Sequence, residues 1–350
     1  MLNYSVAVDW LQVYCENSNF GIIDFQDIDN ASYSFVRQPC SSRQFERIYN
    51  VYDSECELYA VVQSHPFSKI INKKGCIVKL ANRELYKRDF SARFLQFLNI
   101  FQLKYKSISR LDVCFDCNNF ANGMTPRKLI SLLMKGSILK NKQGRAALEF
   151  ETHKVGQWQG IRFGSGTSAV TTVLYNKTRE LAEVKDKPYI RELWKLNGVD
   201  DTREVWRVEI RIKSDATNVV HTDTGEIFRL SPDSVRTDKL VEDIFFSYAR
   251  QYFAFKRNNG TRNKSRMPDI KLFPERKITT KAVRVTQASD ATRADRIFLR
   301  KLCNLEYELR EMPDELKRHI DQVRRDFCLQ KKMTDYYREK VYPQLSRYRG

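Results

Sequence analysis

Apolar and polar residues alternate over several short stretches of the chain, which is the pattern of β-strands that bury one face. Two other stretches, 84–103 and 127–134, repeat their apolar residues at helical spacing, and Pro126 suits the first turn of the second helix. This order of strands with helices between them predicts an α+β fold with a largely antiparallel central sheet and flanking helices. The expected strands are 4–15, 57–63, 76–81, 108–117, 149–150, 161–163, 170–175 and 204–213.

The last hundred residues follow a different pattern. Residues 256–284 contain an Asn-Asn-Gly turn signal, two prolines and ten Lys or Arg against two acids, which is typical of a linker or a basic arm. From residue 291 onward the apolar spacing is helical. We therefore expect an α+β catalytic domain at 1–255, a basic linker or arm at 256–290 and a helical C-terminal region at 291–350. The two apolar stripes are Ile297, Leu302, Leu305 and Leu309, then Leu316, Ile320, Val323 and Phe327.

The net charge of the chain indicates the kind of partner that it binds. The 350 residues include 61 Lys and Arg against 43 Asp and Glu, a formal net charge of +18, which favours a polyanion such as DNA, RNA or an anionic membrane. Residues 250–350 hold 26 basic and 13 acidic side chains, so most of the excess lies there. No apolar run reaches the roughly 18 residues of a spanning helix, and Asp9 interrupts the opening strand. We therefore expect no membrane insertion.

Eight cysteines are scattered without the density or the spacing of a secreted disulfide scaffold, which predicts a reducing, cytoplasmic location. Cys114 and Cys117 form a Cys-x-x-Cys pair. A structural zinc site usually needs a second Cys or His pair at similar spacing, and none follows nearby. We therefore do not expect a zinc site.

Two acids lie on the strand 108–117. Asp112 and Asp116 take the face opposite Leu111, Val113 and Phe115, because side chains alternate along a strand. They are about 13 Å apart, so they cannot both bind one ion directly. Asp112 is a candidate oxygen ligand for Mg²⁺ or Mn²⁺. A solvated strand face explains the same pattern equally well.

The strand 204–213 carries a single acid among bases on its polar face. Glu209 stands between Arg207 and Arg211, with Lys213 beyond. It is either a metal ligand beside phosphate-binding residues or an acid neutralised by its neighbours on an exposed sheet. The pattern alone favours neither interpretation.

A tyrosine follows a glycine-serine loop by one short strand. Residues 164–168 offer backbone N–H groups and the hydroxyls of Ser165 and Ser168 to a phosphate, and Tyr175 ends the next strand. Tyrosine has a pKa near 10, so as a nucleophile it needs a cation that favours the phenolate, such as Lys177 or a metal. The alternative is a packing residue, since the chain has 17 tyrosines.

A second tyrosine pair, Tyr248 and Tyr252, has the Tyr-x-x-x-Tyr spacing of a helix face. Four phenylalanines surround the pair in the sequence. Aromatic residues at helical spacing usually pack, so we expect an aromatic core or a stacking platform here rather than catalysis.

Four segments together resemble a known family. They are Ser-Arg-Leu-Asp-Val-Cys-Phe-Asp, Phe-Gly-Ser-Gly-Thr-Ser, Leu-Tyr-Asn-Lys-Thr-Arg-Glu and Val-Trp-Arg-Val-Glu-Ile-Arg-Ile-Lys, in this order between residues 109 and 213. Together with the opening Val-Asp-Trp-Leu-Gln-Val, this arrangement resembles the Rep_trans family of rolling-circle plasmid replication initiators, which is related to relaxases of conjugative elements. The resemblance spans residues 4–215.

The resemblance implies an activity and its residues. Tyr175, with Lys177 beside it, would attack a phosphodiester at the nick site, giving a 5′-phosphotyrosyl adduct and a free 3′-hydroxyl primer. Asp112, Glu209 and Glu180 would bind Mg²⁺ or Mn²⁺. The implied partners are the origin duplex, a single-stranded nick site and the host helicase and polymerase, and a homodimer is possible.

The DNA contacts that we expect fall into two groups. Ser165, Ser168, Arg207 and Arg211 would hold the phosphate near the nucleophile, and the bases after residue 250 would bind the duplex. Two other functions stay open: a non-catalytic DNA-binding regulator on the same fold, and an RNA-binding protein. The duplex-binding candidates are Lys256, Arg257, Arg262, Lys264 and Arg266.

Overall fold

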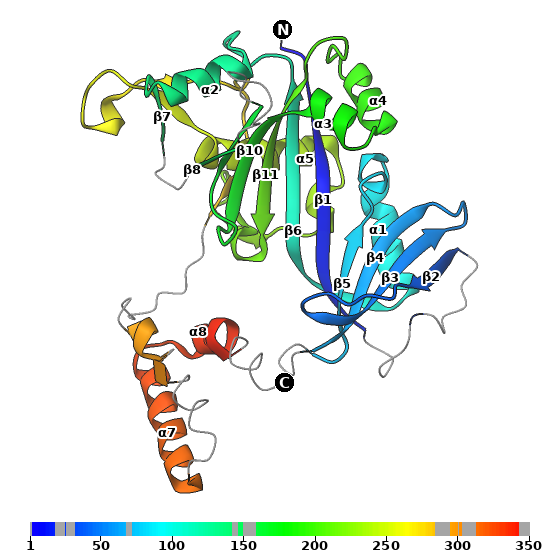
Figure 1. The fold of residues 1–350 in the computed structure, drawn as a ribbon, viewed down its shortest axis with the longest axis vertical. Coiled ribbons are helices and arrows are strands. Elements are labelled where there is room, and N and C mark those ends of the chain that lie inside the picture. The colour runs from blue at the N-terminus through cyan, green and yellow to red at the C-terminus, as the bar shows by residue number, and fades with distance from the viewer. Residues whose placement is uncertain are drawn as a thin grey trace.

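A ten-stranded sheet in which all strand pairs are antiparallel forms the centre of the molecule, with strand order β2-β3-β4-β5-β1-β6-β11-β10-β9-β8 (Figure 1). The computed structural model describes residues 2–17, 25, 32–67, 72–141, 146–149, 159–283, 295–299, 301–302 and 313–342. The predicted α+β fold with a largely antiparallel sheet is confirmed. The strands are β1 Tyr4–Asn17, β2 Tyr33–Arg37, β3 Phe45–Asp53, β4 Leu58–Pro66, β5 Gly75–Leu80, β6 Leu103–Cys117, β8 Ala146–Glu149, β9 Gly160–Phe163, β10 Val170–Asn176 and β11 Trp206–Lys213.

The two longest strands, β1 and β6, pair along their whole length in the middle of the sheet. Their register shifts once near the start: Val8 pairs with Val113 and Trp10 pairs with Asp112, which leaves Asp9 without a partner. Such a bulge turns two consecutive side chains toward one side of a sheet. Asp9 and Trp10 accordingly line the same cavity.

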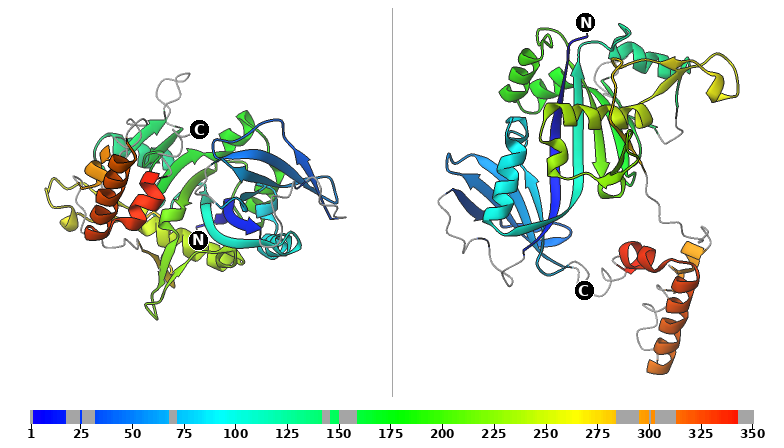
Figure 2. Two further views of the ribbon diagram at one scale, coloured as in Figure 1. Left: turned by 90° about the horizontal axis from the view of Figure 1, so that it is seen from below. Right: turned by 180° about the vertical axis from the view of Figure 1, so that it is seen from behind.

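Helices cover the apolar face of the sheet. Helix α1 (Phe90–Ile100) follows the short helix η2 (Glu84–Tyr86) and packs on β6, whereas α5 (Asp238–Tyr252) contacts β1, β6, β10 and β11. Figure 2, seen from behind, shows α5 crossing these strands. The ring of Phe245 on α5 stacks on Phe115 of β6 at 5.3 Å. Helix α5 therefore leaves the opposite face, which carries Asp112 and Asp116, uncovered.

The tyrosine pair on α5 belongs to this packed layer. Tyr248 is completely buried, and its hydroxyl donates a hydrogen bond to the carbonyl oxygen of Ala216. Its ring stacks with Tyr252 at 6.1 Å. The expectation of an aromatic core at this position is confirmed.

Two short helices, α3 (Lys177–Glu183) and α4 (Pro188–Leu196), stand at one end of the sheet, where α3 contacts β11 and α4 contacts β1 (Figure 1). The side chain of Asn176 accepts a hydrogen bond from the backbone N–H of Arg179, so the end of β10 also caps α3. Trp194 of α4 is fully buried, and its indole N–H donates to Asp116 at 2.7 Å. These contacts fix α3 and α4 against the polar face of the sheet.

Residues 256–283 are part of the folded body, so the expectation of a linker or arm is wrong for them. Strand β14 (Phe255–Arg257) pairs with both β7 (Ile138–Lys140) and β15 (Asp269–Ile270). The segment resembles a linker in composition because it has many charged residues and few apolar ones. The few apolar residues, among them Leu272, nevertheless pack in the core. Only the loop between β14 and β15 projects, shown in yellow in Figure 1. The remaining residues of the expected linker lie outside the described parts.

A second small sheet joins the end of this segment to the body. Strand β16 (Thr280–Ala282) pairs with β12 (Asn218–His221), which pairs with β13 (Ile227–Arg229). Helix α2 (Pro126–Met134) begins at Thr125, whose side chain accepts from the N–H of Lys128. The short helices are η3 Ser214–Ala216, η4 Pro232–Val235 and η5 Lys264–Arg266.

The C-terminal region is helical over most of the residues that the structure describes there. It contains α7 (Asp314–Gln330), α8 (Thr334–Tyr336) and the turn η6 (Tyr337–Val341). Of the predicted stripe on α7, Ile320 is buried and Leu316 is 45% exposed. Leu305 and Leu309 of the other stripe lie outside the described residues. No helix in the described parts combines the length and the apolar character needed to cross a membrane.

Candidate active site

A cavity of about 610 Å³ opens on the polar face of the sheet, opposite α5, and collects most of the predicted chemistry. Strands β1, β5, β6, β9, β10 and β11 and helix α3 all contribute side chains to it. Its cations are Lys79, Arg110, Arg162, Lys177, Lys187 and Arg211, and its acids are Asp9, Asp112, Glu180 and Glu209. Tyr175 also lines this cavity, so a phenol, carboxylates and six cations share one space.

The hydroxyl of Tyr175 donates a hydrogen bond to Oε2 of Glu209 at 3.1 Å. These residues face each other because β10 and β11 are neighbours, and Tyr175 pairs with Arg207, two positions before Glu209. Burial raises the pKa of Tyr175 well above its usual range, and the negative charge of Glu209 raises it further. The phenol is therefore neutral at rest, with a carboxylate in place to accept its proton.

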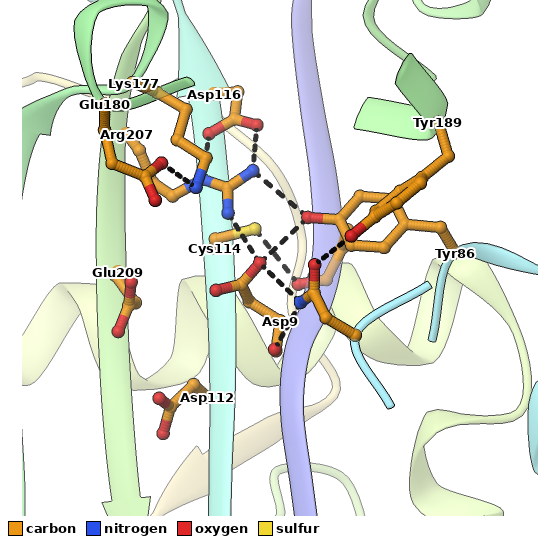
Figure 3. A network of polar contacts seen from close by, with 12 residues as sticks. Asp9, Tyr86, Asp112, Cys114, Asp116, Lys177, Glu180, Tyr189, Arg207 and Glu209 are labelled. Carbon is orange, nitrogen blue, oxygen red and sulfur yellow. Dashed lines mark hydrogen bonds and ion pairs between the residues drawn. The ribbon is translucent and has the colours of Figure 1, made fainter. Parts of the chain in front are cut away.

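Lys177 and Glu180 form an ion pair one helical turn apart on α3. The ammonium of Lys177 lies 5.6 Å from the centre of the Tyr175 ring, so the predicted cation does stand beside the tyrosine. Figure 3 shows Glu180 turned toward Lys177. The Glu180 carboxylate therefore pairs with Lys177 and does not lie beside Asp112 and Glu209, the other two predicted metal ligands.

Asp112 and Glu209 lie near each other on β6 and β11 (Figure 3). The Nε–H of Arg110 lies 2.9 and 3.1 Å from the two carboxylate oxygens of Asp112, and Nη2 of Arg110 also donates to Asp112 Oδ2. Arg211 Nε donates to Glu209 Oε1 at 2.7 Å. Burial raises the pKa of Asp112 to about 7, and the charge of Glu209 adds to that rise against the opposing effect of Arg110. The two carboxylates are therefore close enough to repel each other.

The donor set limits the metal that could bind here. Among the described residues, no group of three or more His, Cys, Asp or Glu side chains is placed to hold a metal ion. Mg²⁺ is often bound through only one or two carboxylates while it keeps several water molecules. Asp112 and Glu209 fit a hydrated ion of that kind. Asp112 and Glu209 are themselves paired with Arg110 and Arg211, so the ion would replace those contacts, whereas Glu180 lies on α3 beside Lys177 and not on the two neighbouring strands.

Two lysines of the cavity, Lys79 and Lys187, have no ion-pair partner among the residues that the structure describes. Burial lowers the pKa of both, and so does a neighbouring cation, Arg110 for Lys79 and Lys177 for Lys187. Lys79 and Arg110 also lie against the ring of Trp10, at 3.5 and 4.1 Å from its centre. Half-buried cations that repel one another create a positive potential that a bound anion would relieve.

Arg207 lies in a buried network beneath the cavity, so the expected phosphate contact does not fit its placement. Its guanidinium is completely buried and donates to Asp9 Oδ1 at 2.6 Å, to both oxygens of Asp116 at 2.7 Å and to the hydroxyl of Tyr86 at 3.1 Å (Figure 3). Burial would raise the pKa of Asp9, but Arg207 and then Lys177 outweigh it and hold that pKa well below the usual range. Arg207 is an internal counter-ion.

The predicted glycine-serine loop does not reach this cavity. Ser168 lines a separate cavity of about 410 Å³, together with Phe163 and Tyr252. The hydroxyl of Ser168 accepts from the backbone N–H of Ser165 at 2.9 Å, so the loop satisfies its own polar groups. The structure therefore does not bring Ser165 and Ser168 to Tyr175.

The basic residues after position 255 differ in their availability. Lys256 is buried, donates to the Met267 carbonyl oxygen at 3.1 Å and pairs with Asp269 at 2.9 Å, which does not fit a phosphate contact. The ammonium of Lys264 donates to the carbonyl oxygen of Lys140 at 3.2 Å. The remaining three, Arg257 at the end of β14 and Arg262 and Arg266 on the projecting loop, are exposed and have no ion-pair partner among the described residues.

Asp9 is a site residue that the sequence pattern did not single out. A single acid inside an apolar strand was the available signal, because such a residue needs either a bulge or a buried partner. Trp10, Lys79, Arg110 and Lys187 were missed as well. Trp10 and Arg110 lie within segments that carry the family resemblance but are given no role by it, and Lys79 comes from β5, which β1 and β6 separate from β11 in the sheet.

A comparison with solved structures finds chains similar to this one. The rolling-circle replication initiator protein from Geobacillus stearothermophilus is similar to it, with a TM-score of 0.47 and 16% sequence identity over 77% of this chain and 93% of that chain. No protein-family model matches the chain, and no curated protein sequence matches it. We therefore base the function on the residues of the site.

Proposed function

We propose that this protein is a replication initiator that cuts and rejoins one DNA strand through Tyr175. The observation that carries the proposal is the cavity itself, where the Tyr175 hydroxyl meets the Glu209 carboxylate among six cations. A phosphodiester is the anion that suits both features, because cations bind the phosphate and a phenol attacks phosphorus. The test is a protein–DNA adduct that survives detergent and maps to Tyr175.

The chemistry balances with the residues in place. Tyr175 Oη bonds to phosphorus while the bond from phosphorus to the 3′ oxygen breaks, and the tyrosine proton passes to Glu209 Oε2. Lys187 is a candidate donor of the proton that the leaving 3′ oxygen takes up, because burial beside Lys177 lowers its pKa. Arg211 and Lys79 hold the phosphate oxygens. Attack of a 3′ hydroxyl on the phosphotyrosine reverses each step and rejoins the strand.

A divalent cation, Mg²⁺ or Mn²⁺, forms part of the proposal. Asp112 and Glu209 would hold it, and when bound it would supply positive charge at the phosphate. We expect Asp112→Asn to weaken Mn²⁺ binding by at least about tenfold, because one of two protein ligands loses its charge. Isothermal titration calorimetry measures this without DNA.

Glu180→Gln is the matched control for the metal site, since it removes a carboxylate of the same cavity that pairs with Lys177. Its Mn²⁺ affinity should stay close to that of the wild type. Equal losses in the two variants, or a wild-type protein that binds no Mn²⁺, would contradict the assignment of Asp112.

The duplex would be bound by the projecting loop between β14 and β15. Neutralising Arg257, Arg262 and Arg266 together should flatten the dependence of log K on log salt by roughly one unit for each DNA phosphate that no longer meets a cation. The comparison variant replaces Lys317, Arg318 and Arg325, three exposed bases of α7, and removes the same charge elsewhere. If α7 replacement flattens the slope and loop replacement does not, the loop is not the duplex-binding element.

A DNA-binding regulator without catalysis is the second function that the basic cavity and loop support. It shares the positive surface but needs no reaction at Tyr175. Failure to form any adduct on DNA that the protein binds tightly would favour it. A relaxase of a conjugative element would use the same chemistry on a transferred strand.

A further inference from the structure

A second cavity, of about 800 Å³, continues the candidate active site along the molecule. It lies between η2 and α4, and the two cavities share Leu58, Ala81, Asn82 and Lys187 in their walls. We call this second cavity the α4 groove. Whatever chain enters the active site can therefore extend into the α4 groove without leaving the surface.

An ordered aromatic side chain faces this groove. The hydroxyl of Tyr189, at the start of α4, donates to Asn82 Oδ1 at 2.7 Å, and its ring packs 5.1 Å from that of Tyr86. Asn82 is itself held, because its amide donates to the backbone oxygen of Asp9 at 2.8 Å. Tyr189 is thus fixed in orientation by the same network that anchors the active site. Leu196, at the far end of α4, leaves an apolar surface that is 76% exposed.

The charges of the α4 groove favour an anion. Two of its acids are already paired, Glu57 with Arg83 and Asp186 with another arginine outside the groove. Lys185 and Lys187 have no ion-pair partner within the described parts of the chain, and Glu192 is the single acid left against them. An aromatic ring next to unpaired cations is the arrangement that binds single-stranded nucleic acid, because bases stack on the ring and phosphates meet the cations.

We propose that the α4 groove binds unpaired nucleotides of the strand whose phosphate lies at Tyr175, with a base stacked on Tyr189. The proposal rests on the proposed function and deepens it by assigning where the flanking nucleotides lie. A base in a duplex has both faces covered by its neighbours, so only an unpaired base can present a face to Tyr189. The α4 groove therefore binds a DNA strand that is already unpaired in preference to a duplex.

The experiment uses full-length protein carrying Tyr175→Phe, so that binding is measured without cleavage. The probe is a fluorescein-labelled single-stranded oligonucleotide of about 16 nucleotides and mixed sequence, followed by anisotropy. Adding Tyr189→Ala should weaken binding roughly 5- to 150-fold, which is the usual effect of removing one stacking platform. Tyr189→Phe keeps the ring and removes only the hydrogen bond to Asn82. It should bind within about twofold of the parent if stacking dominates.

Substitutions of charged residues give a second test, in which the direction of the change in single-strand affinity is predicted. Lys185→Gln should weaken single-strand binding and reduce its salt dependence, whereas Glu192→Gln should strengthen it. Both side chains are exposed, so neither change threatens folding. If Tyr189→Ala binds as tightly as its parent, or if Tyr189→Phe loses as much as Tyr189→Ala, the stacking role is refuted.

The test of the α4 groove and the test of the proposed function can fail independently of each other. Adduct formation by the wild-type protein reports on Tyr175 alone, while anisotropy of the Tyr175→Phe background reports on the α4 groove. Photocrosslinking of a halogenated pyrimidine in the probe, followed by mass spectrometry, should place the bound base on Tyr189. Crosslinks confined to other surfaces would overturn the proposal even if the adduct forms.

Discussion

Tyr175→Phe should abolish the covalent protein–DNA adduct and strand nicking while changing DNA affinity by no more than a few-fold. The variant removes one hydroxyl and with it the only atom that bonds to phosphorus in the proposed reaction. It also removes a single hydrogen bond to the Glu209 carboxylate, worth about 1.5 to 3 kcal/mol, so the fold should persist. Supercoiled DNA carrying the origin, treated with detergent and run on a gel, measures adduct and nicked product together.

Tyr252→Phe is the matched control, since it deletes the same hydroxyl from a tyrosine that packs with Tyr248 on α5. This variant should nick as the wild type does. An active Tyr175→Phe protein with an inactive Tyr252→Phe protein would move the nucleophile to α5. The burial of Tyr248 argues against that outcome.

A third variant tests whether Glu209 acts as the general base for Tyr175. Glu209→Gln keeps an oxygen that accepts the Tyr175 hydrogen bond but cannot take up the proton. Because it also changes one of the two proposed metal ligands, its nicking is measured at saturating Mn²⁺. Nicking should slow by roughly 10² to 10⁴, the usual contribution of a positioned general base, and the residual adduct should still map to Tyr175. Normal rates in this variant would mean that another group receives the proton.

The sequence pattern predicted the centre of the fold better than its edges. Strands β1, β6, β10 and β11 alternate clearly because one face of each packs on α5 and the other lines a polar site. The long strand β3, Phe45–Asp53, was missed. Arg47 stands on the face of the buried Phe45, Tyr49 and Val51, and Ile48 stands on the other face, so the alternation is interrupted. What holds β3 in place is pairing with β2 and β4, which no local pattern reveals.

The expected helix at 84–103 became the short helix η2 and helix α1. The helical spacing was real, but the chain turns between the two at residues 87–89. Both pieces keep their apolar residues on the core, with Leu85 and Phe94 buried. Periodicity identifies which side of a segment is buried and is less sensitive to a break within it.

The sequence predicted those features of the site that depend on one strand alone, namely the face on which a side chain lies and its distance from the strand end. Alternation placed Asp112 and Glu209 on the polar faces, and the strand end placed Tyr175 near them. What faces those residues depends on strand order and register, which the sequence does not state. Arg207 has the same polar-face position as Arg211, yet Asp9 and Asp116 enclose it, whereas Arg211 reaches the cavity.

Arg207→Met should destabilise the protein by about 3 to 5 kcal/mol at neutral pH, the largest effect on stability that we expect from a single substitution. The wild-type guanidinium is completely buried and neutralises both Asp9 and Asp116. Methionine fills a similar volume, so the main loss is electrostatic: two carboxylates stay buried without their cation. Urea unfolding followed by tryptophan fluorescence measures the change.

The pH dependence of that loss tests its electrostatic origin. In the wild type the pKa of Asp9 is held below its usual range, so its stabilising contribution is present above an unfolded-state pKa of about 3.9 and is lost as the pH falls. Without Arg207, burial raises the pKa of Asp9, and acid protonates and relieves the buried charge. The stability difference between wild type and variant should therefore be largest near pH 7 and should narrow toward pH 4. A difference that is constant across this range would mean that Arg207 acts through packing and not as the counter-ion of Asp9 and Asp116.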